Sequence, residues 1–123
     1  MRQDTDFPQC ITVWGWRYHH VGVPTTKPRE GERYLPQFRL FTSGFATSPV
    51  GVEWMRYAPG CEIPELVQTV PHVAFVVDDL DYELANRGFI VVTPPNPPSQ
   101  GVRVAMVEID GAPIELMEFA KPN

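Results

Sequence analysis

Short stretches in which apolar and polar residues alternate, each bounded by Pro, Gly or Asp, dominate this sequence and predict β-strands. The last two expected strands flank Asp110-Gly111, a dipeptide typical of two-residue hairpin turns. Such a turn would place Met106 opposite Glu115 in the paired strands. The expected strands are residues 18–24, 38–42, 50–57, 70–77, 89–93, 102–109 and 113–119.

Three segments depart from this alternation. The segment Asp78-Asp79-Leu80-Asp81 supplies an N-cap and an acidic first turn, and with Gly88 as C-terminal cap it predicts a helix that ends near Arg87. Residues 27–38 hold at most a short helix, because two prolines and a glycine interrupt them. The proline-rich residues 93–101 cannot form a central strand, so we expect a stiff loop that is either the rim of a pocket or a plain connector.

The second half of the chain therefore has the order strand, helix, three strands, and the first half repeats it with a reduced helix. Each copy begins with a strand led by a histidine, His20 or His72, and ends with a strand that carries a glutamate, Glu53 or Glu115. The two residues are 33 positions apart in the first copy and 43 in the second. Internal repetition on this scale indicates paired supersecondary modules, here in an α+β protein.

Composition narrows the class of partner. The 123 residues are 43% hydrophobic, which is enough for a core, and the net charge is −5 with no run of Lys or Arg. A nucleic acid or an anionic membrane is therefore not expected as the main partner. We expect Cys10 and Cys61 to be free thiols. Residues 1–10 have no signal-peptide core and no apolar run could span a bilayer, so a cytoplasmic protein is expected.

Two neutral imidazoles and one or two carboxylates bind a divalent cation and leave positions open for a substrate. The repeat supplies these groups on strands, and strand alternation places each among apolar or small side chains, where an unpaired carboxylate would be costly. The candidate metal ligands are His20, Glu53, His72 and Glu115. The candidate substrate-binding residues on the same faces are Tyr18, Met55, Tyr57, Met106, Met117 and Phe119.

Strand alternation also assigns neighbouring residues to the opposite faces. His19 is expected to point away from His20, and Glu118 away from Glu115. Two simpler roles stay open at this point. His20 taken alone fits a core or edge histidine, and Glu53 fits an ordinary ion pair.

Three motifs resemble the vicinal oxygen chelate superfamily, which includes glyoxalase I, methylmalonyl-CoA epimerase, extradiol dioxygenases and the fosfomycin and bleomycin resistance proteins. The resemblance covers about residues 17–120. The motifs are His20-Val-Gly-Val-Pro-Thr, Pro71-His72-Val-Ala-Phe-Val-Val-Asp-Asp79-Leu-Asp and Asp110-Gly-Ala-Pro-Ile-Glu115-Leu-Met-Glu.

The resemblance implies one glyoxalase-like domain over residues 1–123, with module one at about 17–59 and module two at about 70–120. Two tandem βαβββ modules, the first shortened, would form a curved, open, barrel-like sheet. Metal ligands in the superfamily come from the first and last strands of each module. These positions match His20, Glu53, His72 and Glu115 here.

For function, the resemblance implies a metal-dependent glyoxalase-type lyase, isomerase or epimerase that acts on a small oxygen-chelating substrate through an enolate. Glu115 or Glu53 would be the general base. The ion would be Ni, Zn, Co, Mn, Mg or Fe, and the protein would be a homodimer. One alternative is a bleomycin-resistance-type binding protein without catalysis. The other is an Fe(II) extradiol dioxygenase that uses His20, His72 and Glu115 as a facial triad.

Overall fold

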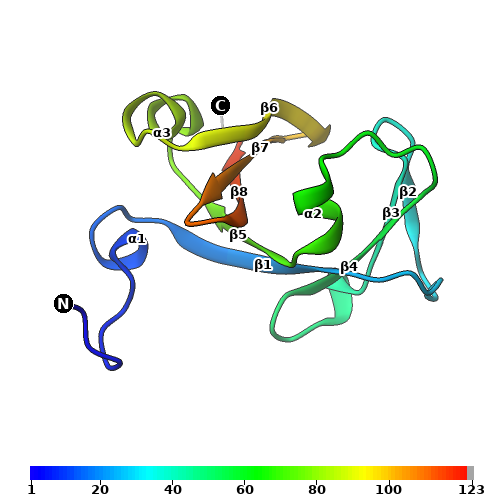
Figure 1. Ribbon diagram of the computed structural model, residues 1–123, viewed down its shortest axis with the longest axis horizontal. Helices are drawn as coiled ribbons and strands as arrows, with labels where there is room; N and C mark the ends of the chain where they lie inside the picture. Colours follow the sequence, from blue (N-terminus) through cyan, green and yellow to red (C-terminus); the bar gives the residue numbers. More distant parts are fainter. Residues whose placement is uncertain (122–123) are drawn as a thin grey trace.

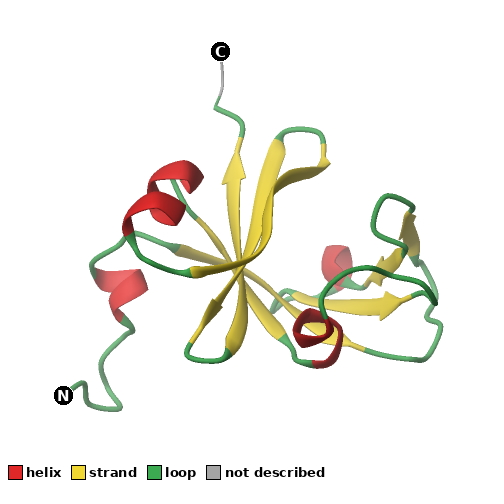
Figure 2. Ribbon diagram, turned by 45° about the horizontal axis from the view of Figure 1, so that its top comes forward, coloured by secondary structure: helices red, strands yellow, loops and turns green. Residues whose placement is uncertain are grey.

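The computed structural model describes residues 1–121, in which eight strands form one curled sheet (Figures 1 and 2). The strands lie in the order β2-β3-β4-β1-β5-β8-β7-β6. Their bounds are β1 Arg17–Pro24, β2 Arg33–Leu35, β3 Leu40–Ser43, β4 Val52–Tyr57, β5 His72–Val76, β6 Ile90–Ser99, β7 Val102–Ile109 and β8 Ala112–Phe119.

The sheet consists of two halves with the same internal order. β1 pairs in parallel with β4, as β5 does with β8, and the antiparallel pair β1–β5 joins the halves at the centre. We call β1–β4 module one and β5–β8 module two. In module two, helix α3 (Leu80–Asn86) follows the first strand, whereas residues 25–32 of module one contain no helix. The predicted pair of βαβββ modules, with the first shortened, is confirmed.

Helix α3 begins where the sequence predicts. The Asp79 side chain accepts a hydrogen bond from the Tyr82 N–H at 3.0 Å, which caps the helix. Leu80 is fully buried against the outer face of module two. The hydrophobic core on this side consists of Trp16, Val77, Leu80, Ala105, Val107 and Leu116. Trp14, which follows the short helix α1 (Gln9–Thr12), packs against this core.

The hairpin prediction is confirmed in its register. Asp110 and Gly111 have φ values of 53° and 82°, which suit a tight turn between β7 and β8. Met106 pairs with Glu115. The two cysteines are free, as expected, and no helix in residues 1–121 is long and apolar enough to cross a membrane.

Two segments differ from the simplest sequence-based expectation. Residues 27–38, expected to hold at most a short helix, form none and contain the short strand β2. The proline-rich segment is not a loop, because most of it belongs to β6, whose pairing with β7 shifts register at several points. β6 is the last strand of the sheet, where prolines are tolerated because one side of the strand needs no hydrogen bonds. A further short helix, α2 (Glu65–Thr69), connects the modules.

Candidate metal centre

Four adjacent strands at the centre of the sheet carry the predicted ligands. His20 is on β1, Glu53 on β4, His72 on β5 and Glu115 on β8, all within one chain. The pairing places His20 and Glu115 in one row on either side of Ala74. Glu53 and His72 lie in the next row on either side of Gly22. Two rows of the same face therefore bring together residues that are far apart in the sequence.

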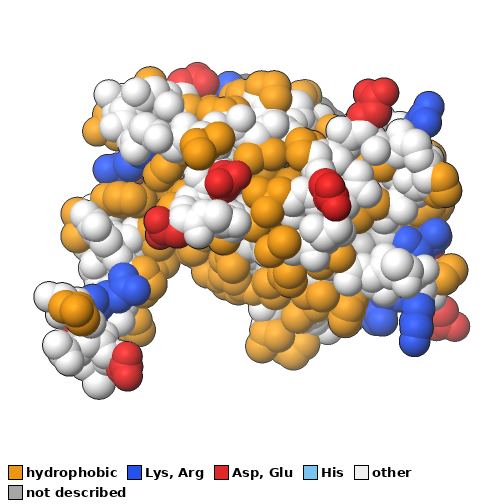
Figure 3. All heavy atoms as spheres, viewed as in Figure 1, with side chains coloured by type: hydrophobic (Ala, Val, Ile, Leu, Met, Phe, Trp, Pro, Cys, Tyr) orange, Lys and Arg blue, Asp and Glu red, His pale blue; other side chains and the backbone are white. Residues whose placement is uncertain are grey.

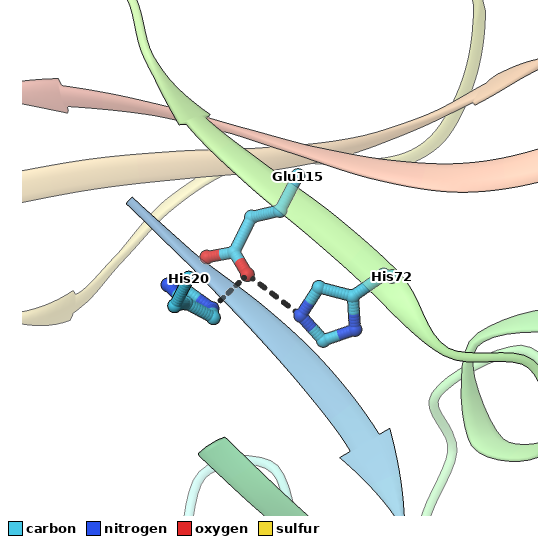
Figure 4. Close-up of side chains that lie close together, drawn as sticks. All are labelled: His20, His72 and Glu115. Carbon is cyan, nitrogen blue, oxygen red and sulfur yellow. Dashed lines mark ion pairs between the residues drawn. The ribbon is translucent and has the colours of Figure 1, made fainter. Parts of the chain in front are cut away.

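Three of the four side chains converge on one point (Figure 4). Oε1 of Glu115 lies 3.3 Å from Nε2 of His20 and 3.0 Å from Nε2 of His72. One ligand atom from each of these residues lies within 4.8 Å of the other two. Glu53 is further out, with Oε1 3.8 Å from Nε2 of His20. The structure thus assembles a His–His–Glu cluster with a second carboxylate at its edge.

Both buried Nε2 atoms of this cluster lie close to the Glu115 carboxylate without a hydrogen bond of good geometry. Nε2 of His20 and Nε2 of His72 are both inaccessible to solvent, and neither has a hydrogen-bond partner with acceptable geometry in residues 1–121. Buried polar atoms are almost always satisfied, because an orphaned one costs about 1–3 kcal/mol. Two imidazole lone pairs and a carboxylate are the donor set of a divalent cation. These residues therefore fit a metal ion by their chemistry and their placement.

The charges around the cluster shift its pKa values. Burial alone would raise the pKa of Glu115, but the imidazoles of His20 and His72 outweigh it and lower the pKa to about 2. Burial alone would lower the pKa of His20, whereas Glu115 and Glu53 raise it above its ordinary value. Burial raises the pKa of Glu53. The two carboxylates therefore differ, with Glu115 held ionised and Glu53 more ready to accept a proton.

A β-bulge at His19 overturns two predictions about β1. Tyr18 pairs with Phe75 and His20 with Ala74, so one extra residue lies between two consecutive pairs. Tyr18 is therefore on the outer face, where its hydroxyl donates to the Val50 carbonyl at 2.8 Å, and it is not a cavity residue. His19, expected to point away, instead lines the cavity beside His20.

His19 also contacts the first predicted ligand directly. Nδ1 of His19 lies 2.8 Å from Nδ1 of His20, and the His19 ring stacks on Phe45 with centroids 4.8 Å apart. A histidine that offers Nε2 to a metal must carry its proton on Nδ1. His20 in that tautomer donates to His19, whose Nδ1 accepts. His19 thus occupies the position of the outer partner that orients a ligating histidine.

A cavity of about 470 Å³ opens above the cluster. It is lined by five of the six predicted substrate-binding residues: Met55, Tyr57, Met106, Met117 and Phe119. Its lining includes Thr93, Asn96 and Pro98 of β6, so the proline-rich segment borders the cavity and is not a plain connector. Gln37 of module one donates to the Pro98 carbonyl at 3.3 Å and connects two walls of the cavity.

Sequence reasoning missed other cavity residues, among them Arg33 and Phe45. Arg33 lies in the segment for which at most a short helix was expected, and the strand that contains it is only three residues long. Phe45 belongs to a single 3-10 turn, η1 (Phe45–Thr47). Neither segment is long enough to show a periodic pattern, so the sequence contained no signal for them.

Comparison with known proteins agrees with this architecture. A hypothetical protein of Bacillus halodurans C-125 superposes with a TM-score of 0.66 at 16% identity, over 88% of this chain and 97% of the other. The methylmalonyl-CoA epimerase of Mycobacterium tuberculosis, a member of the vicinal oxygen chelate superfamily, superposes with a TM-score of 0.61 at 17% identity, over 85% and 89% of the two chains. The chain has the vicinal oxygen chelate fold.

At the level of sequence, no family model and no curated protein matches this chain. The vicinal oxygen chelate fold is therefore recognised through its structure and through the repeated histidine and glutamate positions.

Proposed function

We propose that this protein is a metal-dependent isomerase, epimerase or glyoxalase-type lyase that moves a proton at a carbon next to a substrate carbonyl. The convergence of His20, His72 and Glu115 in one apolar cavity, with both Nε2 atoms buried beside the Glu115 carboxylate, carries this proposal. The activity named for the Mycobacterium tuberculosis neighbour is an epimerisation, which supports the same class of chemistry.

In this proposal, His20, His72 and Glu115 hold the ion, and the remaining residues act on the substrate. A bound divalent cation supplies Lewis-acid polarisation of a carbonyl and orients two neighbouring oxygens. Met106 and Met117 are buried at the cavity wall, where they exclude water and contact the apolar part of a substrate.

We assign proton transfer to Glu53 rather than to Glu115. Glu115 lies 3.3 Å or less from both imidazoles, so its carboxylate is committed to the cluster. Glu53 faces the same cavity 3.8 Å from His20, and its burial raises its pKa above the ordinary value for a glutamate. A carboxylate with a raised pKa is the better general base.

The test is proton exchange in deuterated water. Metal-loaded protein is incubated with 2-oxoaldehyde thiol adducts, 2-methyl-branched acyl thioesters and 2-hydroxyketones. We expect deuterium to enter the carbon next to the carbonyl of one class, and a chelator to stop it. Glu53→Gln should slow exchange by about 10²- to 10⁴-fold while the metal stays bound. Tight binding of small aromatic molecules with no exchange in any class would indicate a binding protein instead.

A second candidate function rests on the cluster without Glu53. Two histidines and one carboxylate are also the donor set of non-haem Fe(II) oxygenases. Oxygen uptake by Fe(II)-loaded protein in the presence of a catechol, with no proton exchange, would select this alternative.

We further propose that the protein is a homodimer. In module one, residues 25–32 between β1 and β2 contain no helix. The outer face of that half of the sheet therefore lacks a helix like α3, which packs on the outer face of module two. Uncovered apolar sheet faces commonly form interfaces. Light scattering should give a mass near twice the 13.9 kDa of one chain. A mass of one chain at micromolar concentration would contradict this proposal.

A further inference from the structure

The cavity contains one permanent positive charge among the residues that the structure describes. Two carboxylates, Glu53 and Glu115, line the cavity on the side of the cluster, together with the histidines. Most other lining side chains are apolar. Arg33, on the edge strand β2, is the single Lys or Arg in the lining. Arg33 is solvent-exposed on β2 and places its positive charge at the open side of the cavity.

No carboxylate in residues 1–121 forms an ion pair with Arg33. Four other arginines form ion pairs: Arg17 with Asp78 at 3.2 Å, Arg56 with Glu32 at 2.7 Å, Arg87 with Glu83 at 2.6 Å, and Arg103 with Asp81 at 3.0 Å. Pairing is thus a common state of arginine in this protein. The fork of donors on Arg33 remains available to a ligand at the cavity.

The distance between Arg33 and the metal-ligand cluster indicates how long a molecule that contacts both would be. Arg33 pairs with Thr42, and Thr42 with Met55, so two strand spacings, about 10 Å, separate Arg33 from β4. Glu53 is two residues from Met55 on the same strand, about 7 Å along it. The backbones of Arg33 and Glu53 are therefore roughly 12 Å apart. Both side chains line the same cavity, so this backbone separation sets the scale for a short molecule that would contact both ends.

The charge of module one agrees with an anionic ligand. Residues 17–57 contain six Lys or Arg against three Glu, a net charge of +3, although the whole chain has a net charge of −5. In Figure 3, basic side chains gather at the end of the molecule where β2 and β3 lie. Such asymmetry attracts anions to one side of a protein even when its total charge is negative.

We propose that Arg33 binds a carboxylate at the far end of the substrate, which makes the substrate a short acid with a carbonyl group at its other end. This inference rests on the proposed function, because the carbonyl end is placed at His20, His72 and Glu115. The middle of the substrate contacts the apolar wall. An Arg–carboxylate pair with two parallel hydrogen bonds fixes orientation as well as affinity.

The test uses matched hydroxamic acids, whose two adjacent oxygens chelate a divalent metal. Each carries a methylene chain that ends in a carboxylate or in the uncharged carboxamide, with short, medium and long chains. Binding to Ni(II)-loaded protein is measured by calorimetry. We expect the carboxylate to bind about tenfold or more tightly than the carboxamide at one chain length, a difference typical of a charged hydrogen bond.

Two variants assign the difference to Arg33. Arg33→Gln should abolish the preference for the carboxylate, while the carboxamide binds as before. Arg29→Gln removes the same charge from module one, but Arg29 stacks over Trp54 outside the cavity, with its guanidinium carbon 4.7 Å from the ring centre. The preference should survive in Arg29→Gln.

Three results would overturn the inference. Equal binding of carboxylate and carboxamide by the unmodified protein, or an unchanged preference in Arg33→Gln, would remove Arg33 from the substrate site and leave the proposed function intact. Failure of both hydroxamate series to bind metal-loaded protein would overturn this inference and the proposed function together.

Discussion

Replacing Gly22 with alanine should abolish metal binding, although Gly22 is not itself a ligand. An added Cβ would lie 2.5 Å from Nε2 and 2.7 Å from Nδ1 of His72, and closer still to Cε1. The imidazole of His72 therefore packs flat against the backbone of β1, and the methyl group would occupy its space. His72 is 1% exposed, so its ring is enclosed on all sides by neighbouring groups. We expect metal affinity to fall by about 100-fold or more, measured by calorimetric titration.

A double-mutant cycle separates this clash from a general effect on β1. Gly22 has no positive φ, so alanine causes no backbone strain there. Gly22→Ala should lower the free energy of unfolding by about 1–3 kcal/mol in the unmodified protein, a cost typical of overpacking. In a His72→Ala background the same change should cost little, because the ring that it strikes is gone. Equal costs in both backgrounds, or unchanged metal affinity of Gly22→Ala, would refute the proposed packing.

The repeated His and Glu positions could be predicted because strand alternation and strand pairing act together. His20, His72 and Glu115 each lie on one face of a strand, and period-two alternation fixes that face from the sequence alone. The turn at Asp110-Gly111 fixed the pairing of β7 with β8. Local rules therefore predicted the hairpin, and the repeat together with the family resemblance selected the cluster residues, since alternation alone does not choose between Glu115 and Glu118.

The errors arose where a single residue interrupts the alternation. Tyr18 and His20 share a face only in a regular strand, and the bulge at His19 moves Tyr18 to the outer face. A bulge requires the partner strand, so β1 alone contains no sign of it. The role of Gly22 was missed for the same reason, because its contact with His72 is made across two strands that are 50 positions apart in the sequence.

The strand propensity of individual residues did not predict the two edge strands of the sheet, β2 and β6. The prolines of residues 94–98 exclude a central strand, which is correct, but they do not exclude an edge strand with shifted register. The segment around Arg33 has too few residues to show alternation. Both segments border the cavity, so this part of the cavity wall was the least predictable from the sequence.

Glu115→Gln should lower metal affinity by more than about 100-fold. Loss of a residue that only hydrogen-bonds to a metal ligand costs ~10- to 100-fold in metal affinity, and loss of a direct ligand should cost more. Glutamine keeps the shape of the side chain and removes its charge. Glu118→Gln is the matched control on the same strand. The Glu118 carboxylate accepts a hydrogen bond from the Leu80 N–H at 2.8 Å and lies outside the cavity, so this variant should lose stability at α3 and keep its metal affinity.

The same pair of variants should differ in acid when metal is absent. The pKa of Glu115 falls from an ordinary value of 4.5 to about 2 on folding, so its contribution to stability is complete above about pH 4.5 and is lost as the pH falls toward 2. The free energy of unfolding, measured in urea between these pH values, should decrease as the pH falls. Glu115→Gln should reduce this dependence on pH by up to about 1.4 kcal/mol per pH unit. Glu118→Gln should keep that part of the slope. An unchanged slope in Glu115→Gln would mean that the imidazoles of His20 and His72 do not hold this carboxylate ionised, and the charge arrangement argued for the cluster would be wrong.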